Sequence, residues 1–336
     1  MLTPIATMTR SEADRLLAPH LRFLVVGELI LDEFIWGKVS RISPEAPVPV
    51  IEVVKESYHA GGAANVARNL REFAGHVHLL GLLGTGPDAD RLRDLLTSGG
   101  IDIAAVQSDA AYQTIRKTRI IARTQQVVRV DRERRASFTP AQRATALERF
   151  TALLPSLDGV ILTDYDKGLL DQPLADAFIR AAGEAGKIVT VDPKPSNPIA
   201  WHDVTAITPN RTEAFRCAGH APSEPVDPPG DDRALLAVGA HLLEKWRCRH
   251  VLITLSEQGM MLFGKDAAPF HIPTRAQEVF DVSGAGDTAI ALFTAALAGG
   301  GTAAQAAEIA THASGIVVGK LGTALVTREE LLASFD

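Results

Sequence analysis

"DVSGAGDT", residues 281–288, stands directly before the apolar run "AIALFTAALA" (289–298). Glycines let successive backbone N–H groups curl around an anion, and a helix start adds unpaired N–H donors at the positive end of its dipole. The stretch therefore predicts a phosphate-binding turn, with Asp287 in the first helical turn as a candidate general base. A plain aspartate cap that follows a glycine turn would explain the same residues equally well.

Composition predicts one globular unit with a large core. The chain has 336 residues, of which 46% are hydrophobic and 22% charged. Its net charge of −6 (34 − 40) gives no reason to expect nucleic acid or an anionic membrane as a partner. Cys217 and Cys248 lack the CxxC spacing, so we expect neither a disulfide framework nor a zinc–cysteine site, and a reducing cytoplasmic location fits.

We expect neither a signal peptide nor a membrane span. The first residues, "MLTPIATMTRSEADRLL", contain acids and no apolar h-region. The apolar run "FLVVGELILDEF" is interrupted by Glu28 and Asp32 and is too short to cross a bilayer. We therefore interpret "FLVVGELIL" as a first core strand.

Short β-rich runs alternate with helix-like segments along most of the chain. Helices are predicted over 87–98, 140–154, 171–185, 231–246, 287–298 and 303–319. The apolar runs "HVHLLGLLG", "GVILTD", "KIVTVD", "DVTAIT" and "HVLITL" are typical of strands that are buried on both faces. This alternation predicts an α/β fold with a central, mostly parallel sheet flanked by helices.

Two regions break the alternation, because hairpin-like strands follow each other there without helices. They are "VPVIEVVKESYHA" (48–60) and "TIRKTRIIARTQQVVRVDRE" (114–133). We predict that they form a small inserted β-sheet. The chain would then be one domain over 1–336, with the inserted sheet built from roughly 36–60 and 112–133.

Polar residues follow several predicted strands. Asp164 and Asp192 end "GVILTD" and "KIVTVD", Asn210 and Ser256 follow the next two strands, and Asp32 follows the first. Open parallel sheets bind ligands beyond the carboxyl ends of their strands, so these residues would collect at a site. The alternative is that strands commonly end where the chain meets water.

Two further motifs carry polar groups near glycines or a helix start. In "AGGAANVARNL", Gly61 and Gly62 would allow close backbone approach to a ligand, and the Asn65 amide could bind sugar hydroxyls. In "TPNRTEA", Asn210 and Glu213 share a face of a helix start and could hold a hydrated Mg²⁺. A tight packed turn and an ordinary N-cap are the respective alternatives.

Taken together, the three motifs resemble, in order and spacing, those of the ribokinase-like, or PfkB-type, carbohydrate kinases. The resemblance extends from about Phe23 to Val326. In this family the inserted sheet forms a lid over the sugar. The segments "RISPEAPVPVIEV", "TIRKTRIIARTQQVVRVD" and "LTDYDKGLL" are similar to the branch that phosphorylates D-glycero-β-D-manno-heptose 7-phosphate at O1 with ATP, for the lipopolysaccharide core, and to its stand-alone form.

The resemblance implies a role for each motif residue. Asp287 would be the base, and the anion hole would consist of the N–H groups of Gly284, Ala285 and Gly286. The sugar would be held by Asp32, Gly61, Gly62 and Asn65. The nucleotide site would comprise Lys194 near the phosphates, Thr254, Ser256 and Gly259 along the nucleotide, and the 310–322 region beside the adenine. Mg²⁺ would be held through water by Asn210 and Glu213, and a monovalent cation could bind at Asp281.

A basic segment favours a substrate that already carries a phosphate. Eight basic residues lie between Arg116 and Arg135, and only two acids oppose them. Arginine and lysine side chains suit phosphate oxygens. The best candidates are Lys117, Arg123 and Arg129, with Arg41 as a further one. For the residues from Arg132 to Arg135, a solvated strand face is the preferred interpretation.

Two rival functions stay open at this stage. One is a kinase of the same fold for another sugar, a sugar phosphate or a nucleoside. The other is a sugar-sensing protein without catalysis on the same scaffold. The open edges of the inserted sheet must be covered or paired. In the family that the chain resembles such edges often meet in a homodimer, so we expect a homodimer.

Overall fold

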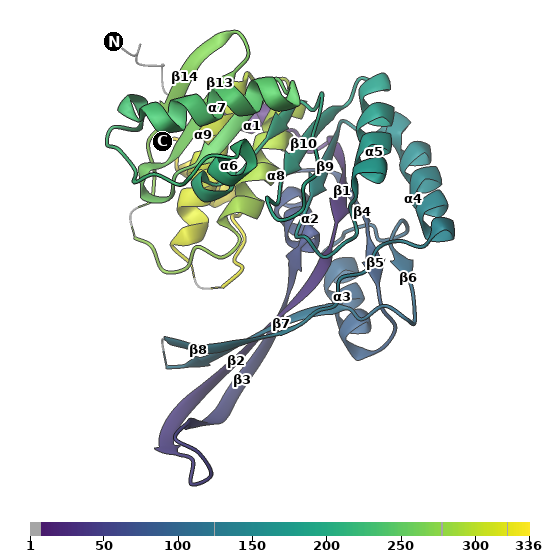
Figure 1. Cartoon of the computed structure of the whole chain (residues 1–336), viewed down its shortest axis with the longest axis vertical. Coiled ribbons are helices and arrows are strands. Elements are labelled where there is room, and N and C mark those ends of the chain that lie inside the picture. The colour runs from purple at the N-terminus through teal and green to yellow at the C-terminus, as the bar shows by residue number, and fades with distance from the viewer. Residues whose placement is uncertain (1–7, 124, 277, 321) are drawn as a thin grey trace.

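The computed structural model describes residues 8–123, 125–276, 278–320 and 322–336. Within these ranges an eight-stranded sheet forms the centre, in the order β14-β13-β12-β11-β10-β9-β1-β4 (Figure 1). Its strands are β1 (Arg22–Gly27), β4 (His76–Leu80), β9 (Gly159–Thr163), β10 (Ile188–Asp192), β11 (Ala206–Ile207), β12 (His250–Thr254), β13 (Met260–Gly264) and β14 (Ala267–Ile272). From β4 to β12 all pairings are parallel, whereas β13 and β14 pair antiparallel at one edge.

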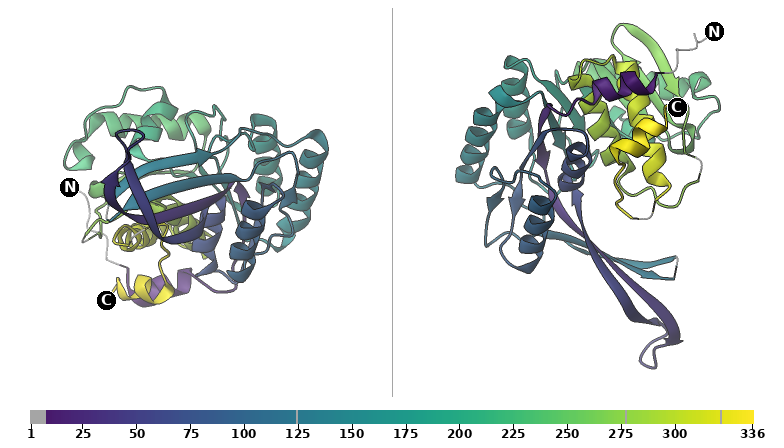
Figure 2. Two further views of the ribbon diagram at one scale, coloured as in Figure 1. Left: turned by 90° about the horizontal axis from the view of Figure 1, so that it is seen from below. Right: turned by 180° about the vertical axis from the view of Figure 1, so that it is seen from behind.

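Helices cover both faces of this sheet and form a separate hydrophobic core on each. One core includes α1 (Arg10–Leu16), α2 (Ala63–Arg71), α3 (Pro87–Ser98), α8 (Ala285–Ala298), α9 (Ala303–Val318) and α10 (Arg328–Ala333). The other includes α4 (Pro140–Leu153), α5 (Gln172–Glu184), α6 (Arg211–Ala218) and α7 (Arg233–Trp246). Seen from behind in Figure 2, α1 and α10 pack side by side near the two ends of the chain. The predicted α/β class is confirmed.

Local sequence signals set the helix boundaries. Thr139 and Thr302 close capping boxes before α4 and α9, and Asp171 and Asp232 cap α5 and α7. The six helices predicted from the sequence are therefore present to within two residues at each end. No helix among the described residues combines the length and apolar character needed to cross a membrane.

The second sheet has the order β3-β2-β7-β8 and projects from the main body (Figure 1). Its strands are β2 (Leu29–Ile42), β3 (Pro49–Gly62), β7 (Ile115–Ala122) and β8 (Gln125–Arg132). A third, two-stranded sheet joins β5 (Leu82–Leu83) to β6 (Gln107–Ser108). The chain thus contains the small separate sheet that the hairpin-like runs predict.

The predicted first strand is corrected by the structure. "FLVVGELIL" is divided at Glu28: β1 ends at Gly27 in the main sheet, and β2 begins at Leu29 in the second. The second sheet consequently starts at Leu29, earlier than the predicted limit of 36. Asp32 lies inside β2 and does not follow a core strand, because the extended backbone passes from one sheet into the other without a turn.

Strand register gives the second sheet two distinct faces. Asp32 and Phe34 of β2 stand in register with Lys117 and Arg119 of β7, and these side chains define the inner face. Phe34 on this face points toward the loop at Gly322 of the main body. Because side chains alternate along a strand, the intervening residues form the outer face. On β8 the outer face carries Val128 and Val130, which are 45% and 39% exposed.

Candidate active site

Asp287 lies in the first turn of α8, where groups from three elements meet. Its Oδ2 accepts a hydrogen bond from Asn65 Nδ2 of α2 at 2.7 Å. Its Oδ1 accepts one from the Tyr165 hydroxyl, in the loop after β9, also at 2.7 Å. Burial raises the pKa of Asp287 to about 6, and the two hydrogen bonds act against that increase. The carboxylate is therefore held in one orientation and titrates close to neutrality, as suits a general base.

The glycine turn before α8 has the conformation that its sequence predicts. Gly284 is the N-cap residue, with φ 85°, and a Cβ there would lie 2.9 Å from Asn65 Nδ2. A Cβ at Gly286 would meet nothing within 4 Å, so its backbone borders open space. The predicted trio of N–H donors is not uniform, because Ala285 N–H donates to Val282 O at 3.2 Å within the turn.

The predicted sugar-binding residues lie together at the base of the second sheet. Gly61 packs so closely on Asp32 that a Cβ at this position would overlap the carboxylate, and Gly62 has φ 60°. Asp32 is buried and forms an ion pair with Arg119. Lys117 stands opposite Asp32 in the β2–β7 register. Its positive charge acts against the increase that burial causes in the pKa of Asp287. The structure thus brings Asp287 and this cluster together.

The other predicted basic candidates lie farther from Asp287. Arg123 is at the β7–β8 turn, where its N–H donates to Gly37 O. It lies beyond the end of β7, six residues from Lys117, or roughly 20 Å along an extended strand. Arg129 pairs with Asp131 at 2.8 Å, and Arg41 is exposed near the far end of β2. The structure does not bring Arg123 or Arg41 to the base.

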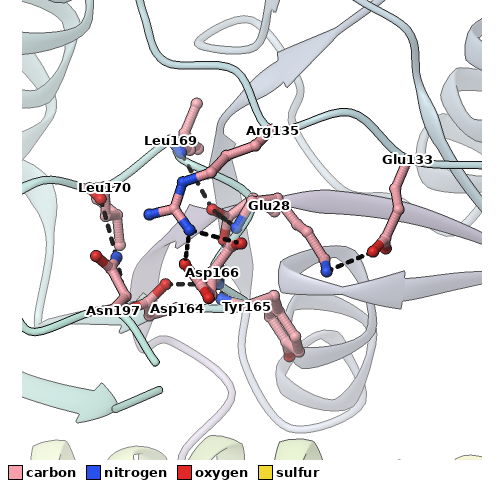
Figure 3. A network of polar contacts seen from close by, with 10 residues as sticks. Glu28, Glu133, Arg135, Asp164, Tyr165, Asp166, Leu169, Leu170 and Asn197 are labelled. Carbon is pink, nitrogen blue, oxygen red and sulfur yellow. Dashed lines mark hydrogen bonds and ion pairs between the residues drawn. The ribbon is translucent and has the colours of Figure 1, made fainter. Parts of the chain in front are cut away.

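A buried glutamate anchors the loop that carries Tyr165 (Figure 3). Glu28 accepts three backbone N–H bonds, from Tyr165 at 3.0 Å and from Lys167 and Leu169 at 3.1 Å each. Its exposed fraction is only 1%, and burial raises its pKa although the three donors act in the opposite direction. Glu28 thereby ties the point where β1 passes into β2 to the loop that orients Asp287.

Asp164, which directly follows β9, extends this network to Asn197. Its Oδ1 accepts the Asp166 N–H at 2.8 Å, and its Oδ2 accepts Asn197 Nδ2 at 3.0 Å (Figure 3). Burial, with a further contribution from the charge of Glu28, raises the pKa of Asp164 to about 7. Arg135 pairs with Asp166 at the outer side of the same loop. The strand-end acid is therefore part of the support beneath the site.

Asn210 and Glu213 form a capping box at the start of α6. Asn210 Oδ1 accepts the Glu213 N–H at 2.9 Å, and Glu213 Oε2 accepts the Asn210 N–H at 3.1 Å. Lys194 Nζ lies 2.7 Å from Glu213 Oε1. The capping alternative is thus realised in the structure, and it places Lys194 beside the pair. In this capping arrangement, the side chains of Asn210 and Glu213 could still contact a metal ion through water.

Of the other residues predicted to line the nucleotide, Thr254 lies beside Asn210. Thr254 forms a β-bridge with Asn210 at the end of β12. Ser256 and Gly259 follow in a turn in which both have positive φ, 54° and 89°. Asp192, at the end of β10, has a pKa raised well above its ordinary value by burial and by the carboxylates of Glu213 and Asp287. The charges of Glu213 and Asp287 thus both act on Asp192, at a place where a divalent cation could be held.

Asp281 is engaged by its own loop. Its Oδ1 accepts the Ser283 N–H at 2.9 Å, and its Oδ2 accepts the Gly322 N–H at 3.1 Å. Each oxygen therefore accepts one backbone hydrogen bond within the loop and keeps a lone pair, so the expected cation at Asp281 and its loop stays a prediction. The predicted adenine-bordering region 310–322 comprises the end of α9 and the turn after it, and Leu321 in that region lies outside the described residues.

Sequence reasoning assigned no role to Glu28, Arg119 or Tyr165. Glu28 was visible as an acid inside an apolar run, which is a signal for a buried charge with backbone partners. Arg119 is one of eight basic residues in its segment. Only the pairing of β7 with β2 brings it to the same face as Asp32, with which it forms an ion pair. Tyr165 follows the strand-end acid Asp164, but its hydroxyl meets Asp287 only through the fold.

Comparisons with known proteins show the family of the chain. Residues 22–330 match the pfkB family carbohydrate kinase. The bifunctional protein HldE of Pelobacter propionicus is 40% identical over 309 residues, which cover 92% of this chain and 62% of that protein. The HldE of Desulfatibacillum aliphaticivorans is 41% identical over 316 residues, covering 94% of this chain and 63% of that protein. The chain thus spans less than two thirds of the length of these relatives.

Solved structures show the same fold at low identity. Arabidopsis thaliana ribokinase, complexed with ribose and ATP, superposes with a TM-score of 0.73 at 19% identity, covering 95% of this chain and 99% of that chain. Phosphofructokinase-2 from Escherichia coli, in complex with substrates and products, gives 0.75 at 16% identity, covering 94% and 98%. The fold is therefore that of the ribokinase-like sugar kinases. The chain belongs to the pfkB family of carbohydrate kinases.

Proposed function

We propose that this kinase transfers the γ-phosphoryl group of ATP to O1 of D-glycero-β-D-manno-heptose 7-phosphate, as a step toward an activated heptose for lipopolysaccharide core. The observation that carries the proposal is the Asp287 carboxylate. Asn65 and Tyr165 hold it at the N-terminus of α8, where the charges of Asp32 and Lys117 on the inner face of the second sheet act on it. The resemblance of segments 41–53, 114–131 and 162–170 to the heptose branch, and the relatives at about 40% identity, support the choice of sugar.

Proton removal and charge stabilisation would come from this chain's own groups. Asp287 takes the proton of the sugar hydroxyl as the hydroxyl oxygen forms its bond to the γ-phosphorus. The bond between that phosphorus and the β–γ bridging oxygen breaks, and ADP leaves. The turn at Gly284 and Gly286 and the positive end of the α8 dipole stabilise the negative charge on the transferring group. Position and electrostatics therefore supply the catalysis.

The acidic residues around Lys194 fit a hard divalent cation. Glu213 and Asp192 offer carboxyl oxygens, and burial, followed by the charges of Glu213 and Asp287, raises the pKa of Asp192. We propose that Asn210 and Glu213 hold Mg²⁺ through water, with Lys194 beside the nucleotide phosphates. When bound, the ion would neutralise charge on those phosphates.

The inner face of the second sheet supports a substrate that carries a phosphate. Arg119 and Arg129 are neutralised by Asp32 and Asp131. Lys117, in contrast, forms no ion pair within the described residues, and burial lowers its pKa. A partly buried ammonium group without an ion-pair partner is stabilised more by an added anion than a cation that is already paired. We therefore propose that Lys117 binds the substrate phosphate and that the second sheet acts as a lid over the sugar site beside Asp287.

A panel of acceptors with ADP detection tests this substrate assignment. We expect kcat/KM for D-glycero-β-D-manno-heptose 7-phosphate to exceed that for ribose, fructose and fructose 6-phosphate. In Lys117→Met the KM for the heptose phosphate should rise about 10- to 100-fold, which is the loss expected for one charge-assisted hydrogen bond.

The matched control for Lys117→Met is Lys38→Met, which removes an exposed ammonium group from β2 of the same sheet. Its KM should stay within about twofold of the wild-type value. Preference for an unphosphorylated sugar would contradict the assignment of substrate. An unchanged KM in Lys117→Met would contradict only the role of that lysine.

We also propose that two copies pair through the second sheet. Val128 and Val130 are exposed on its outer face, and the edge strands β3 and β8 leave backbone groups unpaired. Val128→Asp should convert a dimer of the wild-type protein into a monomer in sedimentation velocity at about 10 μM, because it buries an unpaired charge. Val226→Asp, at a valine of similar exposure in the 218–232 loop, should not. A wild-type monomer would refute the pairing.

A further inference from the structure

A cluster of metal-ligating side chains lies at the edge of the main sheet, apart from the kinase site. His76 and His78 open β4, which is the edge strand beside β1. Asp102 follows α3 and forms an isolated parallel bridge with His78. The cluster is at the amino ends of the parallel strands, whereas Asp287 and its partners are beyond the carboxyl ends. Nothing in the proposed phosphoryl transfer uses these three residues.

Backbone pairing holds the three side chains on one face of the sheet. Asp102 N–H donates to Val77 O at 2.9 Å, and Leu79 N–H donates to Asp102 O at 2.9 Å. This pairing aligns Asp102 with His78, and His76 is two residues away along the same strand, so all three side chains share a face. The two imidazole rings have their centroids 4.5 Å apart. The fold has therefore preassembled the group.

The Asp102 carboxylate has one oxygen fixed and one oxygen directed at both histidines. Oδ1 accepts the Ala104 N–H at 2.8 Å. Oδ2 lies 3.6 Å from His76 Nε2 and 3.1 Å from His78 Nδ1. Three ligands at about 2.0–2.1 Å around a tetrahedral ion are separated by about 3.3 Å, so both distances are near the value required. The hydrogen bond from the Ala104 N–H to Oδ1 fixes the orientation of the carboxylate, as such bonds do for carboxylates that ligate metals.

Exposure and charge also fit a bound ion. The His78 side chain is 8% exposed, so one ligand of the group is fixed within the protein. The His76 and Asp102 side chains are 46% and 34% exposed, which leaves a path for the ion and for water as a fourth ligand. Arg22 is a nearby cation that acts against a divalent ion. Because of this positive charge, we expect the ion to bind with micromolar affinity, more weakly than at closed structural metal sites.

We propose that His76, His78 and Asp102 bind one zinc ion and thereby fasten the edge strand β4 to the segment after α3. Two imidazoles and one carboxylate are a ligand set of late first-row divalent metals and of zinc in particular. An ion pair alone would need only one histidine for Asp102, whereas the geometry directs two rings at one oxygen. The cysteines take no part, because both are buried elsewhere.

Zinc titration of the tag-free, EDTA-treated full chain tests the proposal, with a chromophoric chelator as competitor. We expect one equivalent to bind with micromolar affinity and to raise Tm by a few degrees, about 2–4 °C. His76→Gln and Asp102→Asn should each weaken binding at least tenfold. The amide oxygen introduced by Asp102→Asn can still accept the Ala104 N–H, so this variant removes the charge while keeping the turn. Co²⁺ should give a tetrahedral visible spectrum in the wild type only.

Two controls separate this site from other zinc ligands on the chain. His241→Gln alters an exposed histidine whose ring lies 5.7 Å from His220, and it should leave binding unchanged. Asp287→Asn should also bind zinc as the wild type does, since it changes only the kinase site. The proposal is overturned if the wild type binds no zinc at 100-micromolar concentration, or if His76→Gln and Asp102→Asn bind it as the wild type does.

Discussion

Asp287→Asn should lower kcat by about 10²- to 10⁴-fold while the chain stays folded. The substitution removes the proton acceptor but preserves the size of a side chain that Asn65 and Tyr165 hold from two sides. The pKa of Asp287 is raised from 3.8 to about 6 in the folded chain. The free energy of unfolding therefore decreases as the pH rises from 3.8 to about 6, because the folded chain must ionise a carboxyl group that it holds better in the protonated form. The variant should therefore be at least as stable as the wild type at pH 7. Steady-state kinetics and thermal unfolding measure both effects.

The pH profile supplies an independent check on the same residue. The base acts only when ionised, so wild-type kcat/KM should fall as the pH drops below about 6. The residual activity of Asp287→Asn should lack this acid limb. Near-normal turnover in the variant, or an unchanged limb, would assign the proton transfer to another group.

Glu28→Ala should destabilise the chain by about 2–5 kcal/mol and also slow turnover. It leaves three backbone N–H groups of the 164–170 loop without their acceptor in a place closed to water. The same loop carries the Tyr165 hydroxyl that orients Asp287, so loosening it should lower kcat more than it changes KM. Denaturant unfolding and steady-state kinetics test the two consequences together.

Two variants distinguish the structural from the catalytic part of this effect. Glu28→Gln keeps one acceptor oxygen and should recover part of the lost stability. Tyr165→Phe removes only the hydroxyl, so it should lower kcat roughly tenfold with less loss of stability, and move the acid limb to higher pH because one donor to Asp287 is gone. If Glu28→Ala were as stable and active as the wild type, the anchoring role would be wrong.

Much of the fold follows from local sequence signals. Apolar runs such as "GVILTD" become buried parallel strands, and capping residues such as Thr139 and Asp171 mark the starts of predicted helices near the expected positions. The division at Glu28 could not be predicted, because an extended backbone continues through it and only its direction in space changes sheets. Periodicity reports the local conformation of a segment and not the sheet to which it belongs.

The candidate site was predictable to the extent that it lies in continuous motifs. The turn before α8, the glycines at 61–62 and the Asn210–Glu213 pair are each local and were identified as such. Tyr165 reaches Asp287 across 122 positions of sequence, and Glu28 reaches the same loop across 137. Lys117 and Arg123 looked alike in the sequence, and only the pairing of β7 with β2 separates them. Contacts set by tertiary packing leave little trace in one sequence.

The most direct test is ³¹P NMR of the product formed from ATP and D-glycero-β-D-manno-heptose 7-phosphate. We predict a new phosphate ester at the anomeric carbon, formed together with ADP, at a rate that Asp287→Asn reduces by at least 10²-fold. Absence of transfer to this sugar, or a new ester at any carbon other than C1, would contradict the proposed function.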